Sequence, residues 1–88
     1  MFYKIIENYL KNMTKNDVFL FASKNDINLN NLELDYIYNI IKNDYKELLS
    51  SNYNIIFENA KSVIRSDNLK KIYNLYIDYR SKYLHYLN

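Results

Sequence analysis

Apolar side chains recur at the period of an α-helix along nearly the whole sequence. In the segment 2–12 and just after it, the apolar residues fall at i, i+3, i+4, i+7, i+8 and i+11: Phe2, Ile5, Ile6, Tyr9, Leu10 and Met13. This spacing predicts an amphipathic helix. The segment 15–24 carries five consecutive apolar residues, Val18 to Ala22. Because no other segment alternates as a pairing strand would, we expect a helix here too, apolar nearly all round and the most buried of the chain.

Two of the predicted helices carry matching start signals. Thr14 precedes Asp17 by three residues, and Asn30 precedes Glu33 by three residues. In such a capping box the first side chain accepts a bond from a free backbone N–H, and the acid lies near the positive end of the helix dipole. Apolar residues flank each start at the spacing of a hydrophobic staple. We therefore expect the segment 13–42 to be the best-defined part of the chain.

The remaining segments complete an all-α pattern. A third helix begins after Asn30 and ends either near Asn43 or at Leu49, since its apolar face continues unbroken to that point. Ser50 or Ser51 is expected to cap a fourth helix, and a last helix runs from about Asp67 to Leu87. The sequence thus predicts one domain over residues 1–88, an irregular or orthogonal bundle of about five helices.

Composition supports a single small domain without covalent reinforcement. The 88 residues include no cysteine, glycine or proline, whereas Asn, Lys, Ile and Tyr are abundant. A low-GC genome explains that abundance, because these residues have AT-rich codons. Without glycine, we expect Asn12, Asn25 and Asn43 to supply left-handed backbone at helix ends. The sequence shows neither a signal peptide nor a membrane-spanning run, so a cytoplasmic protein is expected.

A family resemblance rests on the order of these caps and helices. The run ASKNDINLNNLELDYIYNII, the later pair Ala60-Lys61 and the second serine cap at Ser66 resemble the YqfT-like family of small uncharacterised Bacillus-type proteins. The similarity covers nearly the whole chain and is strongest over 14–41. After Lys42 the chain has Asn-Asp-Tyr where the family pattern has a glycine-containing turn. The resemblance implies a small helical cytoplasmic protein and transfers no site residue.

Catalytic chemistry finds little support in the sequence. The one histidine, His85, has no cysteine or second histidine with which to hold a metal. Neighbouring carboxylates such as Glu33 and Asp35 are spaced for helix starts and solvated faces rather than as an acid/base pair. No glycine-rich loop exists to cradle phosphate. We therefore expect no enzyme, no cofactor, no metal site and no small-molecule substrate.

Basic residues collect in the last third of the chain. Residues 61–82 contain six Lys or Arg and two Asp, a net +4, and since the chain carries +2, the remainder carries −2. Lys61, Arg65, Lys70 and Lys71 are candidates for a basic corner that binds nucleic acid. Acidic residues share the same helix face, so nucleic-acid binding is the alternative hypothesis rather than the leading one.

Tyrosine is the other unusual feature, with eleven residues, five of them in 73–86. Codon bias alone would place many of them at core boundaries, where the ring is buried and the hydroxyl reaches water. Tyr and Arg are also the residues that anchor protein interfaces. The candidate partner-binding residues are Tyr76, Tyr79, Arg80, Tyr83 and Tyr86. The leading hypothesis is an interaction or adaptor module that binds a protein partner or a second copy of itself.

Overall fold

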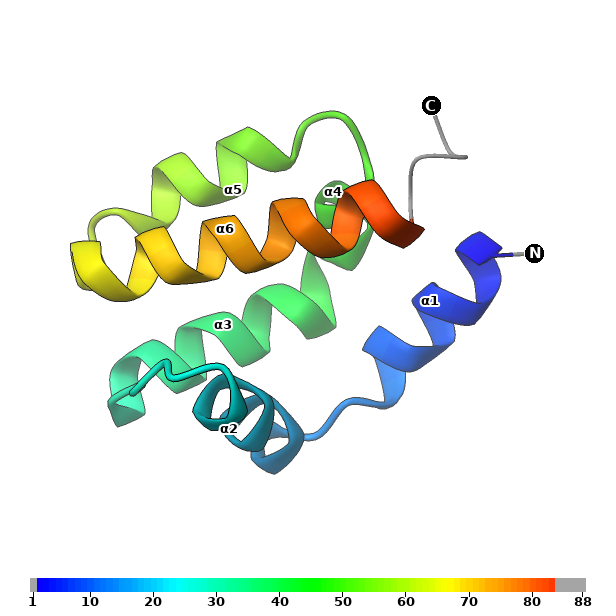
Figure 1. Cartoon of the computed structure of the whole chain (residues 1–88). Coiled ribbons are helices and arrows are strands. Elements are labelled where there is room, and N and C mark those ends of the chain that lie inside the picture. Colours follow the sequence, from blue (N-terminus) through cyan, green and yellow to red (C-terminus); the bar gives the residue numbers. More distant parts are fainter. Residues whose placement is uncertain (1, 84–88) are drawn as a thin grey trace.

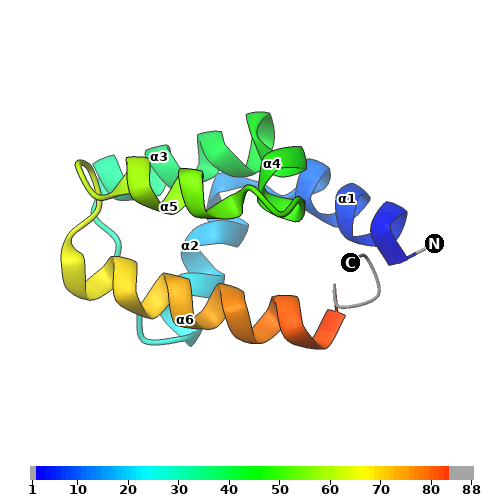
Figure 2. The ribbon, with the colours of Figure 1, turned by 90° about the horizontal axis from the view of Figure 1, so that it is seen from above.

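The protein is all-helical, as the sequence predicts. A computed structural model describes the backbone of residues 2–83 and, of these, the side chains of residues 4–82. Within that range the regular elements are six helices: α1 (Phe2–Asn12), α2 (Lys15–Lys24), α3 (Asn31–Asn43), α4 (Tyr45–Leu49), α5 (Tyr53–Ala60) and α6 (Ser66–Tyr83). Figures 1 and 2 show α6 lying beside α5, with α1 at the end of the molecule away from the α5–α6 connection. Across this range, none of the helices combines the length and apolar character that crossing a membrane requires.

Both predicted capping boxes are confirmed. The Thr14 hydroxyl accepts the Asp17 N–H at 3.0 Å, and the Asp17 carboxylate accepts the Thr14 N–H at 2.9 Å. The Asn30 side chain accepts the Glu33 N–H at 2.8 Å, and Glu33 accepts the Asn30 N–H at 3.0 Å. These bonds satisfy backbone donors that a helix start leaves without partners. They fix the first residues of α2 and α3.

The third helix ends early, so the bundle has six described helices rather than five. Asp44 leaves the helical conformation at φ −117° and ψ 21°, and its N–H closes α3 on the Ile40 carbonyl at 2.8 Å. The short α4 then follows. Ser50 ends α4 by donating to the Glu47 carbonyl at 2.7 Å, and it accepts the Asn52 N–H at 3.0 Å. The predicted serine cap of the following helix is wrong, because Asn52 is the residue before α5 and makes no side-chain cap bond.

Left-handed backbone occurs at Asp26 rather than at the predicted asparagines. Within the described range, Asp26 is the non-glycine residue with positive φ, at 61°. The Ile27 N–H bonds the Ala22 carbonyl at 2.9 Å and the Asp26 N–H bonds the Ser23 carbonyl at 3.1 Å, which together form a Schellman motif. Asn25 instead caps α2 through its side chain, which donates to the Phe21 carbonyl at 2.8 Å. Asp26 takes the position where glycine is usual.

The fully buried apolar core is small. Among the described residues, its members come from three helices, α2, α4 and α5, and from the connections on either side of α2 and between α5 and α6: Met13, Val18, Ala22, Ile27, Leu49, Ala60 and Ile64. The prediction that α2 is the most buried helix is wrong: Val18 and Ala22 are buried, but seven of its ten residues are exposed, Phe19 and Leu20 among them, against five of thirteen in α3. A helix with neighbours on one side exposes the rest of its surface, whatever its composition. Many apolar side chains are consequently only partly covered.

Candidate functional site

An apolar cleft runs through the centre of the domain. Its volume is about 650 Å³, and residues from all six helices line it. The seven buried apolar side chains named above all belong to its lining, so the cleft extends into the core of the domain. On α6 the lining follows the helical period through Leu69, Ile72, Leu75 and Tyr79. This stripe extends roughly 15 Å along the helix at about 1.5 Å per residue.

The cleft opens between α1 and the last turns of α6. Three of its lining residues are exposed and therefore mark the rim: Ile5 and Tyr9 on α1, at 67% and 62% exposure, and Tyr79 on α6. Tyr79 packs against the ring of Phe21, with 5.7 Å between the ring centroids. Figures 1 and 2 show α1 and the last turns of α6 as separate helices at the same end of the molecule. The rim thus consists of large apolar and aromatic side chains.

The cleft opens to solvent at its rim, so its exposed apolar walls contact water, which finds few polar partners there. Covering apolar surface is favourable by about 25 cal/mol per Å². The arrangement therefore favours an apolar occupant.

Among the described residues, one cation lies on the wall of the cleft. The Arg80 guanidinium stacks over the Tyr53 ring, 4.5 Å from its centroid, and its Nη1 donates to the Tyr76 hydroxyl at 3.0 Å and to the Leu48 carbonyl at 3.5 Å. The Tyr76 hydroxyl itself donates to the Leu48 carbonyl. Burial raises the pKa of Tyr76, and Arg80 acts in the opposite direction. Stacking and hydrogen bonds hold the guanidinium in one orientation at the edge of an apolar surface.

The predicted partner-binding residues of α6 divide into two roles. Tyr76 and Arg80 are partly buried and bond within the fold, so they line the cleft rather than form an exposed stripe. Tyr79 is exposed and lies on the rim. The side chain of Tyr83 and the whole of Tyr86 lie outside the part that the structure describes, as does His85. The tyrosine-rich end thus contributes to the cleft through residues 76–80.

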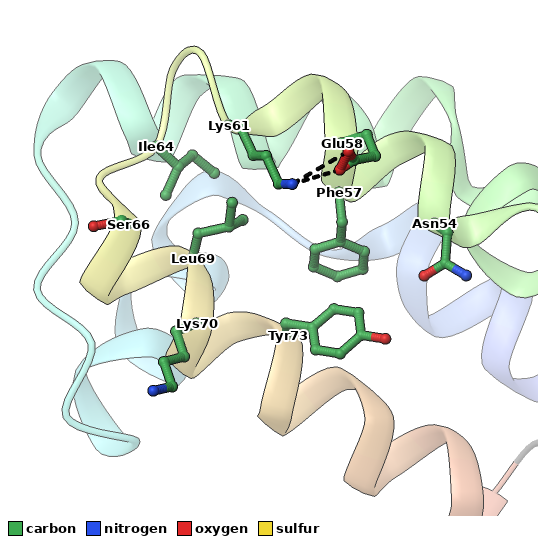
Figure 3. A pocket seen from close by; sticks show the side chains of 9 residues that line it. All are labelled: Asn54, Phe57, Glu58, Lys61, Ile64, Ser66, Leu69, Lys70 and Tyr73. Carbon is green, nitrogen blue, oxygen red and sulfur yellow. Dashed lines mark hydrogen bonds and ion pairs between the residues drawn. The ribbon is translucent and has the colours of Figure 1, made fainter.

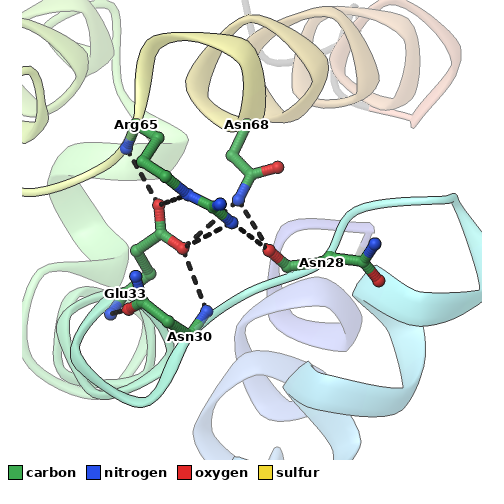
Figure 4. A network of polar contacts seen from close by, with 5 residues as sticks. All are labelled: Asn28, Asn30, Glu33, Arg65 and Asn68. Carbon is green, nitrogen blue, oxygen red and sulfur yellow. Dashed lines mark hydrogen bonds and ion pairs between the residues drawn. The ribbon is translucent and has the colours of Figure 1, made fainter.

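The predicted basic corner is largely engaged in internal contacts. Arg65 donates its backbone N–H to Glu33 at 2.9 Å and its Nε to the same carboxylate oxygen at 3.3 Å, and its Nη2 donates to the Asn28 carbonyl at 2.6 Å (Figure 4). Lys71 donates to the Asp26 carbonyl at 2.9 Å. These contacts join the loop before α3 to the start of α6. Arg65 and Lys71 therefore have structural roles.

Lys61 and Lys70 flank a second hollow. It lies between α5 and the first turns of α6, with a volume of about 620 Å³, and Phe57, Leu69 and Tyr73 form its apolar floor (Figure 3). Lys61 pairs with Glu58, with 2.6 Å between Nζ and the nearer carboxylate oxygen. Lys70 is exposed and forms no ion pair among the described residues. The four predicted nucleic-acid contacts thus do not form one free basic surface.

Glu33 is the feature that sequence reasoning underestimated. The pattern assigns it to a capping box, yet the residue is 0% exposed and also accepts bonds from Arg65 and from the Asn68 amide, the latter at 3.2 Å. Burial opposes its ionisation, but the N–H bonds from Asn30 and Arg65 and the Arg65 charge outweigh burial, and the pKa of Glu33 is lowered. Glu33 and Arg65 are 32 residues apart, and no local pattern signals their pairing.

Comparisons with known proteins leave the family open. The chain matches no family model, no curated protein sequence and no solved structure. The resemblance to the YqfT-like family stays a prediction. Among the described residues, no group of three or more His, Cys, Asp or Glu side chains is placed to hold a metal ion.

Proposed function

We propose that this protein is a protein–protein interaction module, and that its apolar cleft takes the apolar face of an amphipathic helix from a partner protein. The observation that carries the proposal is the cleft with its exposed rim of Ile5, Tyr9 and Tyr79. Binding an amphipathic helix in an apolar groove is a recurring mode of peptide recognition, with anchors at i, i+3, i+4 and i+7. The chain is expected to act by binding, without catalysis.

The shape of the cleft supports a helical occupant. The α6 stripe from Leu69 to Tyr79 extends roughly 15 Å, close to three turns of helix at about 5.4 Å each. Most of the residues that line the cleft belong to helices, so an added helix would pack by the rules that already hold the domain together. The occupant would cover the exposed side chains of Ile5 and Tyr9. Large exposed apolar surfaces mark interaction sites in soluble proteins.

Selection from a peptide library tests the proposal without a known partner. The probe is a phage-displayed library of helical peptides randomised at i, i+3, i+4 and i+7 and at the positions that flank them, selected against the whole chain. We expect enrichment of peptides with large apolar residues at these four positions. The affinity of a fluorescently labelled, selected peptide is then measured by anisotropy on the native protein and on variants.

The exposed isoleucines provide matched controls. Ile5→Ser should weaken peptide binding at least about tenfold, because about 1.4 kcal/mol of lost apolar contact corresponds to tenfold in affinity. Ile55→Ser removes an equally exposed isoleucine, 61% against 67%, that does not line the cleft, and should leave the affinity unchanged. Equal binding by the native protein and Ile5→Ser would contradict the proposal. So would a native dimer that Ile5→Ser dissociates, because the cleft would then hold a second copy.

Nucleic-acid binding stays the alternative prediction. Three of its four candidate residues, Lys61, Arg65 and Lys71, already have internal partners, which lowers the charge available to phosphates. Titration of random duplex and single-stranded DNA against increasing salt tests it directly. A steep loss of affinity with salt supports this alternative, and no binding at low salt eliminates it.

A further inference from the structure

We propose that the Arg80 guanidinium binds a carboxylate, so that the helix taken by the cleft carries an Asp or Glu at a fixed position beside its apolar anchors. This inference rests on the proposed function and names the chemistry of the partner. It concerns a feature that the apolar character of the cleft does not require: the cation that the described lining carries at Arg80.

Arg80 has no acidic partner within the described part of the chain. The ion pairs there join Lys15 to Asp35, Lys61 to Glu58, Arg65 to Glu33, Lys71 to Asp26 and Lys82 to Asp78. Arg80 instead contacts a hydroxyl, a carbonyl oxygen and an aromatic ring. A partly buried cation gains most from an anion when the surroundings are apolar, because the local dielectric is low. The charge of Arg80 is therefore left for a bound molecule to neutralise.

The carboxylate-binding edge of Arg80 makes no hydrogen bond within the described part of the chain. Its hydrogen bonds to Tyr76 and Leu48 both use Nη1. A guanidinium has five donors in a rigid plane, and two parallel bonds from one edge match the two oxygens of a carboxylate. The Nε and Nη2 donors form such an edge here. Because the Tyr53 ring lies beneath the guanidinium at 4.5 Å, the plane is already oriented before a ligand arrives.

The position of Arg80 places this contact near the entrance of the cleft. Its neighbour Tyr79 belongs to the exposed rim, whereas the buried lining residues Val18 and Ile64 belong to α2 and to the connection between α5 and α6. An acidic residue at the border of an amphipathic helix's apolar stripe could reach Arg80 while its apolar anchors enter the cleft. An apolar peptide without an acid would leave Arg80 covered and unpaired, which is unfavourable. The site therefore selects among helices that all fit its shape.

The same peptide selection tests the inference when the selected sequences are compared for charge. We expect Asp or Glu to be enriched at one position relative to the apolar anchors. A selected peptide with Glu at that position, and its Glu→Gln version, are then measured on the native protein and on Arg80→Gln. On the native protein, Glu→Gln should weaken binding by at least about tenfold, since breaking a covered charge pair has effects of this size or larger. On Arg80→Gln the two peptides should bind within about twofold of each other.

The peptide substitution keeps the test valid even if Arg80→Gln disturbs the fold, because the native protein alone distinguishes Glu from Gln. Arg80→Lys retains the charge but lacks the planar edge, and should recover only part of the preference for Glu. Selected peptides without a recurrent acid, or equal binding of Glu and Gln peptides to the native protein, would overturn the inference while leaving the interaction module intact. A selection that enriches no peptide at all would overturn the proposed function itself.

Discussion

Replacing Glu33 by Gln is the perturbation whose effect the structure defines best. The two carboxylate oxygens accept bonds from the Asn30 N–H, the Arg65 N–H and guanidinium, and the Asn68 amide. Glutamine has nearly the same shape, but one oxygen becomes an NH₂ group that faces donors instead of accepting from them. Whichever oxygen the NH₂ group replaces, at least two of these hydrogen bonds are lost, and the NH₂ group then faces the N–H donors that formed them. The negative charge beside Arg65 is lost as well.

The expected loss of stability is about 3 kcal/mol. Removing one partner of a buried ion pair costs roughly 3 to 5 kcal/mol. The value should lie at the lower end, because the Arg65 side chain is 55% exposed and can turn toward water once Glu33 is neutral. Urea unfolding followed by circular dichroism measures the difference in the free energy of unfolding. For a domain of ordinary stability, such a loss is a large part of the total.

The pH dependence of this difference separates charge from shape. The pKa of Glu33 is lower in the folded protein than its ordinary value of 4.5, so its charge contributes stability that is fully present above pH 4.5. That contribution is lost as the pH falls through the folded pKa. The difference in the free energy of unfolding between the native protein and Glu33→Gln should therefore become smaller in acid.

The other capping box supplies the control. Asp17→Asn changes the corresponding acid of the box at the start of α2, where the carboxylate is exposed and pairs only locally with Thr14. Its effect should be clearly smaller than that of Glu33→Gln. Equal losses in the two variants, or a Glu33→Gln effect that stays constant into acid, would refute the account of Glu33 as the charged centre of a buried network.

Three further predictions concern other parts of the fold. Tyr76→Phe removes the hydroxyl between Leu48 and Arg80 and should lower the free energy of unfolding in urea by about 1 to 2 kcal/mol. Because burial raises the pKa of Tyr76 above 10.0, this stabilisation should be lost as the pH rises beyond that value. A difference in stability between the native protein and Tyr76→Phe that stays constant up to high pH would contradict this expectation. Asp26→Gly should raise the thermal midpoint, since a non-glycine residue at φ 61° costs about 1 kcal/mol, whereas Asp26→Val should lower it. A fall in the midpoint with Asp26→Gly would show that the Asp26 side chain is favoured for its contact with Lys71. Ile5→Ser should leave the thermal midpoint of the unbound protein within about 2 °C of the native value, because the side chain is already 67% exposed, and a larger fall would mean that Ile5 supports the fold rather than a partner.

Local signals in the sequence predict the parts of the fold that depend on neighbouring residues. The capping boxes at Thr14 and Asn30 form as their spacing indicates, because both partners lie within one helical turn. The break at Asp44 is less predictable, since the apolar period continues across it into α4. There the chain turns although the pattern would allow a longer helix.

Long-range features explain most of what the sequence does not reveal. In the sequence, Arg65 is one of several basic residues, and only the fold brings it next to Glu33, which lies 32 positions earlier. The cleft is equally hidden, because each apolar residue that lines it would also suit a core position. Ile5 and Tyr9 satisfy the helical stripe of α1, yet the neighbouring helices leave them exposed. Periodicity shows which side of a helix is apolar but not whether another helix covers it.

Methyl NMR on isoleucine-labelled protein tests the central claim most directly, because isoleucines lie both inside and outside the cleft. Ile5, Ile41 and Ile72 line it, whereas Ile55 and Ile77 do not. On titration with a selected helical peptide, we predict changes in the methyl shifts of the first three and none at Ile55 and Ile77. Shifts confined to Ile55 and Ile77, with the cleft signals unchanged, would contradict the assignment of the cleft as the binding site.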